Sequence, residues 1–292
     1  MNYRKEFDAI GTHWCIDLPA KLDAQRVEFV MGMIHRRIEE FDCAYSRFRE
    51  DSMVTAMSKH CGRYELPADA APMLAFYRTL YNLTRGAVTP LIGQALSDAG
   101  YDAEYSLITK SMTSPKAWDD VMHVEGSMVT LAEPVLLDFG AAGKGYLIDI
   151  VSDLIEAQGI ESYCVDAGGD MRHRGEADEP LRVGLENPAD ATQVIGVASI
   201  VNRSICGSAG NRRAWGTFTH ILDPRLLTSP RHILAVWVVA DSTMIADGLT
   251  TALMFASPET LRSECNFEYA ILRSDFSLER SVNFPGEFFL AS

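Results

Sequence analysis

A glycine-rich segment at residues 138–149 places an aspartate and a lysine immediately before an apolar, helix-like run. Asp138 opens the segment, and Lys144 stands between Gly143 and Gly145. Glycines let a backbone approach a ligand closely, and helix N-termini attract anions through unpaired N–H groups. A lysine at that point is a natural partner for a phosphate group. The glycine spacing fits neither a P-loop nor a dinucleotide-binding fingerprint, so the segment alone is also compatible with an ordinary turn.

Two further segments carry residue types suited to proton transfer and to cation binding. His220 ends a predicted strand just before the turn at Pro224, where a neutral imidazole could take a proton from a hydroxyl. Asp247 and Thr251 are four residues apart in a predicted helix, so both oxygens project from one face and suit a hard cation such as Mg²⁺. Alone, each segment also fits a purely structural hydrogen bond.

A fourth segment, residues 207–211, reads Gly-Ser-Ala-Gly-Asn and draws attention to Ser208 as a nucleophile. A nucleophile elbow needs glycines two residues to either side of the serine, whereas here the preceding glycine is adjacent. We therefore predict a phosphate-binding or structural loop at this point.

The elements that must position these residues mix hairpins with helices, which predicts an α+β fold rather than a regular βαβ series. Apolar spacing predicts helices over 22–41, 69–84, Pro90 to Gly100, the glycine-rich segment to Gln158, and 242–256. Strands are predicted over 7–18, 121–124, 128–131, 163–166, 181–185, 194–200, 217–222, 233–240, 268–273 and 276–282. No repeat or linker divides the chain, so residues 1–292 are expected to form one domain. This domain could consist of two lobes with the site between them.

Charge and cysteine usage narrow the class of protein. The net charge of −14 disfavours binding to nucleic acid or to anionic membrane, because both depend on Lys and Arg. The six cysteines are scattered without a C-x-x-C pair, which indicates reduced thiols. No apolar run is long enough to span a membrane, and the N-terminus shows no export signal. We expect a cytoplasmic protein without membrane insertion.

In chain order, the segments above and several others resemble the motifs of the ApbE family, the FAD:protein FMN transferases. The similar segments are Ile10–Thr12, Tyr45–Ser52, Thr84–Pro90, residues 138–149, Asp166–Asp170, Ser208–Gly210, His220–Pro224 and Asp247–Thr251. Each is weak alone, but their common order over most of the chain is specific.

The resemblance implies an α+β fold and Mg²⁺-dependent transfer of FMN from FAD to a Thr or Ser of an acceptor flavoprotein, with release of AMP. The residues that it makes catalytic are His220, Asp247 and Lys144. Those that it places at the metal are Ala141, Asp247 and Thr251. Those that it places at FAD are Ile10, Phe48, Ala87, Val88, Thr89, Asp138, Lys144, Gly168, Gly169, Ser208 and His220.

The chain departs from the family pattern at four places. Thr89 stands where the family has Asp, Met57 where Asn is usual, and Gly143 where Ala precedes the lysine. Residues 225–230 replace the usual Thr-Gly-x-Pro. The first change removes a carboxylate from the expected flavin region, and the last bears on recognition of the acceptor.

Two other functions fit the same residues. A Mg²⁺-dependent FAD diphosphatase would use water as the acceptor and release FMN and AMP. A non-catalytic FAD-binding protein would have no need of a metal pair such as Asp247 and Thr251. The family's acceptors carry a motif like Asp-Gly-x-Ser/Thr-Gly-Ala-Ser/Thr, which this sequence lacks, so the chain is expected to be the modifying enzyme.

Overall fold

The computed structural model describes residues 3–176, 178–211 and 213–289. The helices are α1 (Ala24–Tyr45), α2 (Met53–Met57), α3 (Ala70–Leu83), the 3-10 helix η1 (Pro90–Ile92), α4 (Gly93–Asp98), α5 (Trp118–Val121), α6 (Gly143–Ala157), α7 (Thr243–Ala252) and α8 (Pro258–Leu261). The strands are β1 (Tyr3–Ala9), β2 (Thr12–Leu18), β3 (Gly62–Glu65), β4 (Met122–Glu125), β5 (Met128–Leu131), β6 (Tyr163–Ala167), β7 (Asp170–Arg174), β8 (Leu181–Asn187), β9 (Asp190–Ile200), β10 (Ser204–Ala209), β11 (Ala214–Trp215), β12 (Phe218–Thr219), β13 (Ile233–Ala240), β14 (Glu268–Arg273), β15 (Leu278–Arg280) and β16 (Gly286–Phe288).

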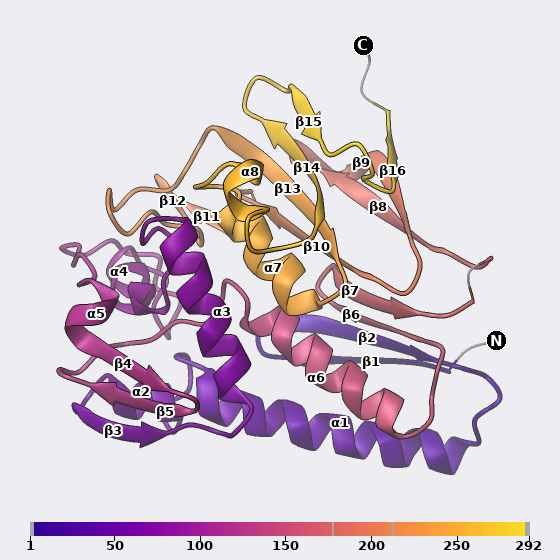
Figure 1. Cartoon of the computed structure of the whole chain (residues 1–292), viewed down its shortest axis with the longest axis horizontal. Helices are drawn as coiled ribbons and strands as arrows, with labels where there is room; N and C mark the ends of the chain where they lie inside the picture. Colours follow the sequence, from indigo (N-terminus) through magenta and orange to yellow (C-terminus); the bar gives the residue numbers. More distant parts are fainter. Residues whose placement is uncertain (1–2, 177, 212, 290–292) are drawn as a thin grey trace.

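One large antiparallel sheet joins the two ends of the chain. Its strand order is β1-β2-β6-β7-β10-β13-β14-β15, so strands from the first twenty residues pair with strands from the middle of the sequence. Smaller sheets, ordered β16-β9-β8, β3-β5-β4 and β11-β12, lie around it. Figure 1 shows β8, β9 and β16 to the right of β13 and β14, and β3, β4 and β5 at the lower left of the molecule. The mixture of helices and antiparallel sheets is the predicted α+β class.

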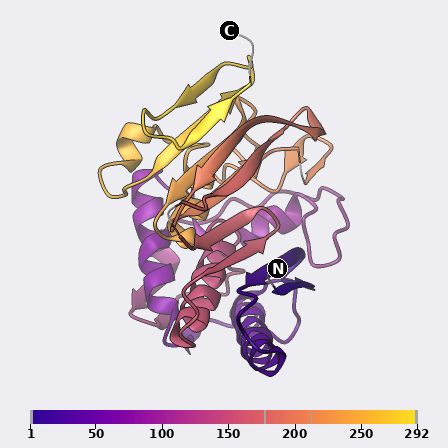
Figure 2. The ribbon, with the colours of Figure 1, turned by 90° about the vertical axis from the view of Figure 1, so that its right-hand side faces the viewer.

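Long amphipathic helices cover the main sheet. In α1, Asp23 caps the N-terminus by accepting a hydrogen bond from the Arg26 N–H at 2.8 Å, and the apolar stripe from Val27 to Phe41 is buried. Figure 1 shows α1 beside α6, with both helices next to β1, β2 and β6. Figure 2 shows the helices gathered below the strands of the C-terminal third. No helix among the described residues has both the length and the apolar character needed to cross a membrane.

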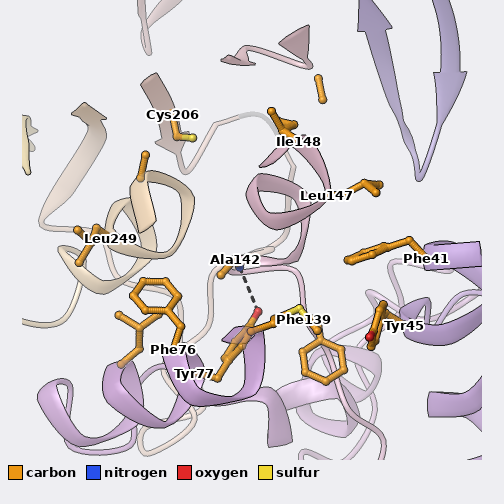
Figure 3. Packing of buried hydrophobic residues seen from close by; sticks show 14 of the residues in the cluster. Phe41, Tyr45, Phe76, Tyr77, Phe139, Ala142, Leu147, Ile148, Cys206 and Leu249 are labelled. Carbon is orange, nitrogen blue, oxygen red and sulfur yellow. Dashed lines mark hydrogen bonds between the residues drawn. The ribbon is translucent and has the colours of Figure 1, made fainter. Parts of the chain in front are cut away.

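The helices α3, α6 and α7 meet at the start of α6. Tyr77 on α3 is fully buried, and its hydroxyl oxygen accepts a hydrogen bond from the Ala142 N–H at 3.0 Å, as Figure 3 shows. This bond satisfies one N–H group at an N-terminus that has no side-chain cap of its own. Leu249 of α7 and Cys206 of β10 lie in the same packed cluster (Figure 3). Buried packing therefore holds the glycine-rich segment in place.

Two tight hairpin turns lie at one end of the main sheet. The β1–β2 turn has Ile10 and Gly11 at φ of 44° and 72°, and the β6–β7 turn has Gly168 and Gly169 at 64° and 94°. Positive φ at both central residues is the type I′ geometry that matches strand twist, and it is unusual for a β-branched residue such as Ile10. The Gly168 N–H donates to the His13 carbonyl at 2.9 Å, so the two turns are adjacent.

Several predicted elements differ from those observed. The strand expected over 7–18 is two strands, because Ile10 and Gly11 turn the chain back on itself. The loop expected at 207–211 is largely strand β10, where Gly207 leaves room for the ring of Trp237 on the neighbouring strand. The strand expected over 217–222 is limited to the two residues of β12. The Thr219 N–H donates to the Ser229 hydroxyl, so it does not donate to the carbonyl of a neighbouring strand.

The remaining predictions agree closely with the structure. The hairpin of β4 and β5 and the long helices appear as expected. The irregular segment predicted over residues 103–120 ends earlier, because α5 begins at Trp118. The largest core cluster contains residues from Trp14 to Ile271. A single domain remains a prediction that this continuous core favours.

Candidate active site

A cleft of about 720 Å³ opens between the hairpin turns, the start of α6 and the face of α7. Every residue that the sequence placed at FAD, at the metal or in catalysis lines this cleft: Ile10, Phe48, Ala87, Val88, Thr89, Asp138, Ala141, Lys144, Gly168, Gly169, Ser208, His220, Asp247 and Thr251. The fold thus brings together residues that are as much as 241 positions apart, as the numbers 10 and 251 show. Their individual roles remain predictions.

One end of the cleft is built on charged groups at the start of α6. The Lys144 ammonium forms an ion pair with Asp170 Oδ2, and the Asp170 side chain is almost completely buried. The other oxygen of that carboxylate accepts a hydrogen bond from the Gly207 N–H at 3.1 Å. Asp170 thereby holds the lysine side chain in the wall of the cleft, where it would meet a phosphate group.

Asp247 of α7 faces the same end. Its Oδ2 accepts a hydrogen bond from the Gly145 N–H at 2.8 Å, while its Oδ1 has no hydrogen-bond partner within the described ranges. Burial raises the pKa of this carboxyl, and the Lys144 ammonium and the Gly145 N–H oppose that rise. A buried carboxylate with one free oxygen is an incomplete site that a cation can satisfy.

The donors at this position fit Mg²⁺. Asp247, Thr251 and Ala141 all line the cleft and supply a carboxylate, a hydroxyl and a backbone carbonyl, which are hard oxygen donors. Among the residues that the structure describes, no cluster of three or more His, Cys, Asp or Glu could hold a metal by itself. Mg²⁺ is commonly held by one or two carboxylates together with substrate phosphates, so a single acid suits a cation that arrives with a pyrophosphate.

A second carboxylate positions α7 against α6. Asp149 accepts hydrogen bonds from the Ser242 hydroxyl at 2.7 Å and from the N–H groups of Thr243 and Met244 at 2.9 Å each. Its Oδ1 also accepts a hydrogen bond from Arg172 Nη1 at 3.2 Å. A carboxylate at a helix N-terminus is stabilising because the N–H groups there lack partners. This contact fixes the helix that carries Asp247.

His220 lies in the wall of the cleft with its Nδ1 buried. Burial, together with the positive charge of Arg213, lowers the pKa of this histidine to about 4. The imidazole is therefore neutral near pH 7, which is the state a general base requires. Because Nδ1 is buried, Nε2 is the nitrogen that can serve a group in the cleft.

The other end of the cleft is aromatic. Phe48 stacks on Tyr105 with ring centroids 5.3 Å apart and an interplanar angle of 16°, and its ring meets Tyr101 edge-on at 5.4 Å. Trp215, which does not line the cleft itself, stacks on Tyr101 with ring centroids 5.8 Å apart. Such a wall favours a flat aromatic ligand over a flexible polar one.

Two hydroxyl groups among the residues predicted to bind FAD already form hydrogen bonds within the protein. Thr89 caps η1 by accepting a hydrogen bond from the Leu91 N–H at 3.2 Å. Ser208 shares a hydrogen bond of 2.7 Å with Thr250, so it is not poised as a nucleophile. Thr89, which replaces the aspartate of the family pattern, therefore caps η1 through its hydroxyl oxygen.

The two hairpin turns supply backbone to the cleft rather than side chains. An added Cβ at Gly168 would lie 2.1 Å from the Thr12 hydroxyl, so only glycine permits this approach of the two turns. The Gly169 N–H donates to Asp166 at 2.8 Å, which fixes the turn. Ile10 and Gly169 both line the cleft.

Residues 10–270 match the model of the ApbE family, which is most of the chain. The chain belongs to the ApbE family. The earlier resemblance is confirmed at the level of the family and of the fold.

Individual relatives are distant but cover most of the chain. The FAD:protein FMN transferase of Vibrio cholerae is 27% identical over 246 residues, which are 77% of this chain and 73% of that protein. The protein of the same name from Escherichia coli K12 is 22% identical over 275 residues, 87% of this chain and 78% of its own length. The solved flavin transferase ApbE from Vibrio cholerae superposes with a TM-score of 0.80 at 22% identity and covers 96% of each chain. The ApbE protein of Thermotoga maritima gives 0.82 at 20% identity, with 97% of each chain covered.

Four further polar residues in or beside this ApbE-family cleft escaped the sequence analysis, and all but Asp149 line it. They are Arg47, Asp149, Asp170 and Arg213, each with partners distant in the sequence. Asp149 and Asp170 stand at the ends of two family-like motifs, which is the one signal that could have indicated them. Nothing in the sequence near Arg47 or Arg213 reveals the partner of either side chain.

Proposed function

We propose that this chain transfers FMN from FAD to a Thr or Ser hydroxyl of an acceptor flavoprotein and releases AMP. The observation that carries the proposal is the convergence of Lys144, Asp247 and His220 on one cleft in a member of the ApbE family. Relatives named FAD:protein FMN transferase give the substrate and the kind of acceptor.

In this reaction the acceptor oxygen forms a bond to the phosphorus on the FMN side of the pyrophosphate. The bond from that phosphorus to the bridging oxygen breaks, and this oxygen leaves with AMP. Nε2 of His220 takes the proton of the attacking hydroxyl, since the imidazole is neutral. Lys144, steadied by Asp170, neutralises charge on the phosphates as the bond breaks.

Asp247, Thr251 and the Ala141 carbonyl would hold Mg²⁺ against the pyrophosphate. When bound, the cation supplies Lewis-acid neutralisation of the phosphoryl oxygens. The buried setting of Asp247 strengthens any charge interaction made there, because little water remains to screen it.

The compartment and the acceptor are part of the proposal. All six cysteines are unpaired, which supports a reducing compartment, and we assign the chain to the cytoplasm. The acceptor is then a flavoprotein accessible from the cytoplasm that carries the Asp-Gly-x-Ser/Thr-Gly-Ala-Ser/Thr type of motif.

A single incubation tests the function. The purified protein is mixed with FAD, Mg²⁺ and a substrate protein that carries the acceptor motif. We expect flavin fluorescence on the denatured acceptor together with an equal amount of AMP. Omission of Mg²⁺, or the change Asp247→Asn, should lower the rate by at least about a hundredfold, because the metal-binding carboxylate is lost.

A matched control is Asp241→Asn, which makes the same chemical change at an exposed carboxylate paired with Arg203. This variant should transfer FMN at the wild-type rate. AMP and FMN released with a dark acceptor would instead identify an FAD diphosphatase. FAD that binds without any turnover would identify a flavin-binding protein and contradict the proposal.

A further inference from the structure

Arg47 is a buried cation with unused hydrogen-bonding capacity at the aromatic end of the cleft. Its side chain is 2% exposed, and its Nε donates to Asp138 Oδ2 at 2.5 Å. Neither Nη1 nor Nη2 has an acceptor in the described part of the chain. Nη2 is buried without a partner, and such a nitrogen is costly unless something outside the protein completes the site.

A nearby arginine, by comparison, has a hydrogen-bond acceptor for every nitrogen of its guanidinium group. Arg49, two residues further on, uses all three of its nitrogens on Glu39, Asp42 and Asp51. Both arginines line the cleft, but Arg47 makes one hydrogen bond, although it is the more deeply buried of the two. Carboxylates of the protein therefore accept hydrogen bonds from all three nitrogens of Arg49 but from only one nitrogen of Arg47.

The surroundings of Arg47 indicate the shape of the missing partner. Its guanidinium carbon lies 4.2 Å from the centre of the Phe48 ring and 4.9 Å from that of Tyr101. Those rings hold the guanidinium in place by cation–π contact. A flat ring against this aromatic wall would bring its edge to the free nitrogens of Arg47.

The chemistry of the donors indicates what that edge must carry. Arginine only donates hydrogen bonds, so its partner must be an acceptor. The isoalloxazine ring of FAD has two carbonyl oxygens on its pyrimidine edge, whereas adenine offers only ring nitrogens. Asp138, which orients Arg47, opens the glycine-rich segment, while the phosphate-binding Lys144 lies at the start of α6.

We infer that Arg47 donates hydrogen bonds to a carbonyl oxygen of the isoalloxazine ring and so selects the flavin half of the substrate at this end of the cleft. The inference rests on the proposed function for the identity of the substrate as FAD. Arg47 is a specificity-determining residue, and Asp138 and Phe48 position it.

The test uses two fragments of the substrate as separate probes of the full-length protein. Lumiflavin has the isoalloxazine ring without ribityl chain or phosphates, and ADP has the adenine and phosphates without the flavin. The variant Arg47→Lys keeps a positive charge beside Asp138 but loses the planar fork. The matched control is Arg49→Lys, because the donors of Arg49 are already used by carboxylates.

We expect Arg47→Lys to weaken lumiflavin binding by about tenfold or more, the usual effect of losing a charge-assisted hydrogen bond, with ADP binding unchanged. Arg49→Lys should change neither affinity. Unchanged lumiflavin binding in Arg47→Lys would overturn the inference. Loss of ADP binding with lumiflavin binding retained would also overturn it, because Arg47 would then contact phosphate.

Infrared spectra of the wild-type complex give a second measurement that does not depend on the folding of a variant. The carbonyl stretching bands of bound lumiflavin should lie below those in an aprotic solvent, and unshifted bands would overturn the inference. Wild-type protein that binds neither lumiflavin nor FAD would overturn the proposed function itself. Normal FMN transfer with unchanged lumiflavin binding in Arg47→Lys would remove the inference alone.

Discussion

Individual side chains in this cleft take their chemical state from what surrounds them. His220 is the clearest case, since burial and the charge of Arg213 lower its pKa to about 4. Asp247 shows the opposite trend for an acid, because burial raises the pKa of its carboxyl and the Lys144 ammonium opposes that rise only in part. Phosphoryl transfer to a hydroxyl needs a neutral base to take the proton and a carboxylate that can bind the metal ion.

The pH dependence of FMN transfer should follow from His220. The base must be neutral, so the acid limb of kcat/KM in wild-type protein is expected near pH 4 and not near the ordinary value of 6.5. His220→Gln should lower the rate and remove that limb. The measurement is a rate profile from about pH 3 to 8 at saturating Mg²⁺, and an acid limb centred near pH 6.5 would contradict the assignment.

The same histidine links pH to stability. Its pKa is depressed in the folded state, so below pH 6.5 the unfolded chain binds a proton that the folded chain does not. Stability should therefore fall between about pH 6.5 and 4 by a contribution that His220→Gln removes. Urea unfolding of both proteins at pH 7 and pH 5 measures that difference.

At the scale of elements, the site depends on how closely α6 approaches α7. Gly145 makes this possible, because an added Cβ would lie 2.3 Å from the Thr243 carbonyl oxygen and 2.6 Å from Asp247 Cβ. The Gly145 N–H reaches Asp247 across the same contact, and Asp149 secures the start of α7 one turn further along α6. The two helices thus form one unit that carries both Lys144 and Asp247.

Gly145→Ala should separate this pair of helices. We expect it to destabilise the protein by about 1–3 kcal/mol, because backbone must move to admit the methyl group. It should also raise the Mg²⁺ concentration needed for half-maximal transfer, since Asp247 shifts with α7. Urea unfolding and a Mg²⁺ titration of the rate measure the two effects.

Gly32→Ala is the matched control. Gly32 lies in the middle of α1, is exposed, and has no atom within 4 Å of an added Cβ. The same substitution should there stabilise the protein by up to about 1 kcal/mol, because alanine favours helix more than glycine does. Equal effects of the two substitutions would argue against the close contact at Gly145.

At the scale of the whole molecule, the cleft collects residues from nearly the full length of the chain. The strands nearest the N-terminus, the glycine-rich segment and α7 all contribute to its walls. The protein carries a net charge of −14, and carboxylates as well as cations line the cleft, where Arg47 pairs with Asp138 and Lys144 with Asp170. The overall charge disfavours polyanions such as nucleic acid, so an anionic ligand must be held by these local side chains.

A substrate that bridges these walls should stabilise the fold as a whole. With FAD and Mg²⁺ at about a hundred times the dissociation constant, ligation stabilises the folded state by about 2.7 kcal/mol, or roughly 5 °C in Tm or more. Asp247→Asn should lose the part of this shift that depends on Mg²⁺. Thermal unfolding with FAD alone, and with FAD and Mg²⁺ together, measures it, and no shift in wild-type protein would contradict binding across the cleft.

The sequence by itself determined the long helices and a set of candidate residues that the fold brings to one cleft. The 3.6-residue apolar spacing of α1, α3 and α6 and the motifs around Asp138, His220 and Asp247 could all be recognised without coordinates. Such patterns are visible because helix periodicity and glycine-rich turns depend on neighbouring residues. The two strands that meet at Gly11, and the strand through Ser208, were misjudged because turn geometry and packing against Trp237 override local preference there.

Only the tertiary structure decided which side chains are partners. Lys144 with Asp170, Arg47 with Asp138, and Asp149 with the start of α7 are contacts between residues that are 26 to 95 positions apart. The free oxygen of Asp247 and the low pKa of His220 likewise follow from burial, which no local sequence reveals. The reason is physical: desolvation and hydrogen bonding set the state of a charged group, and both depend on what the folded chain packs around it.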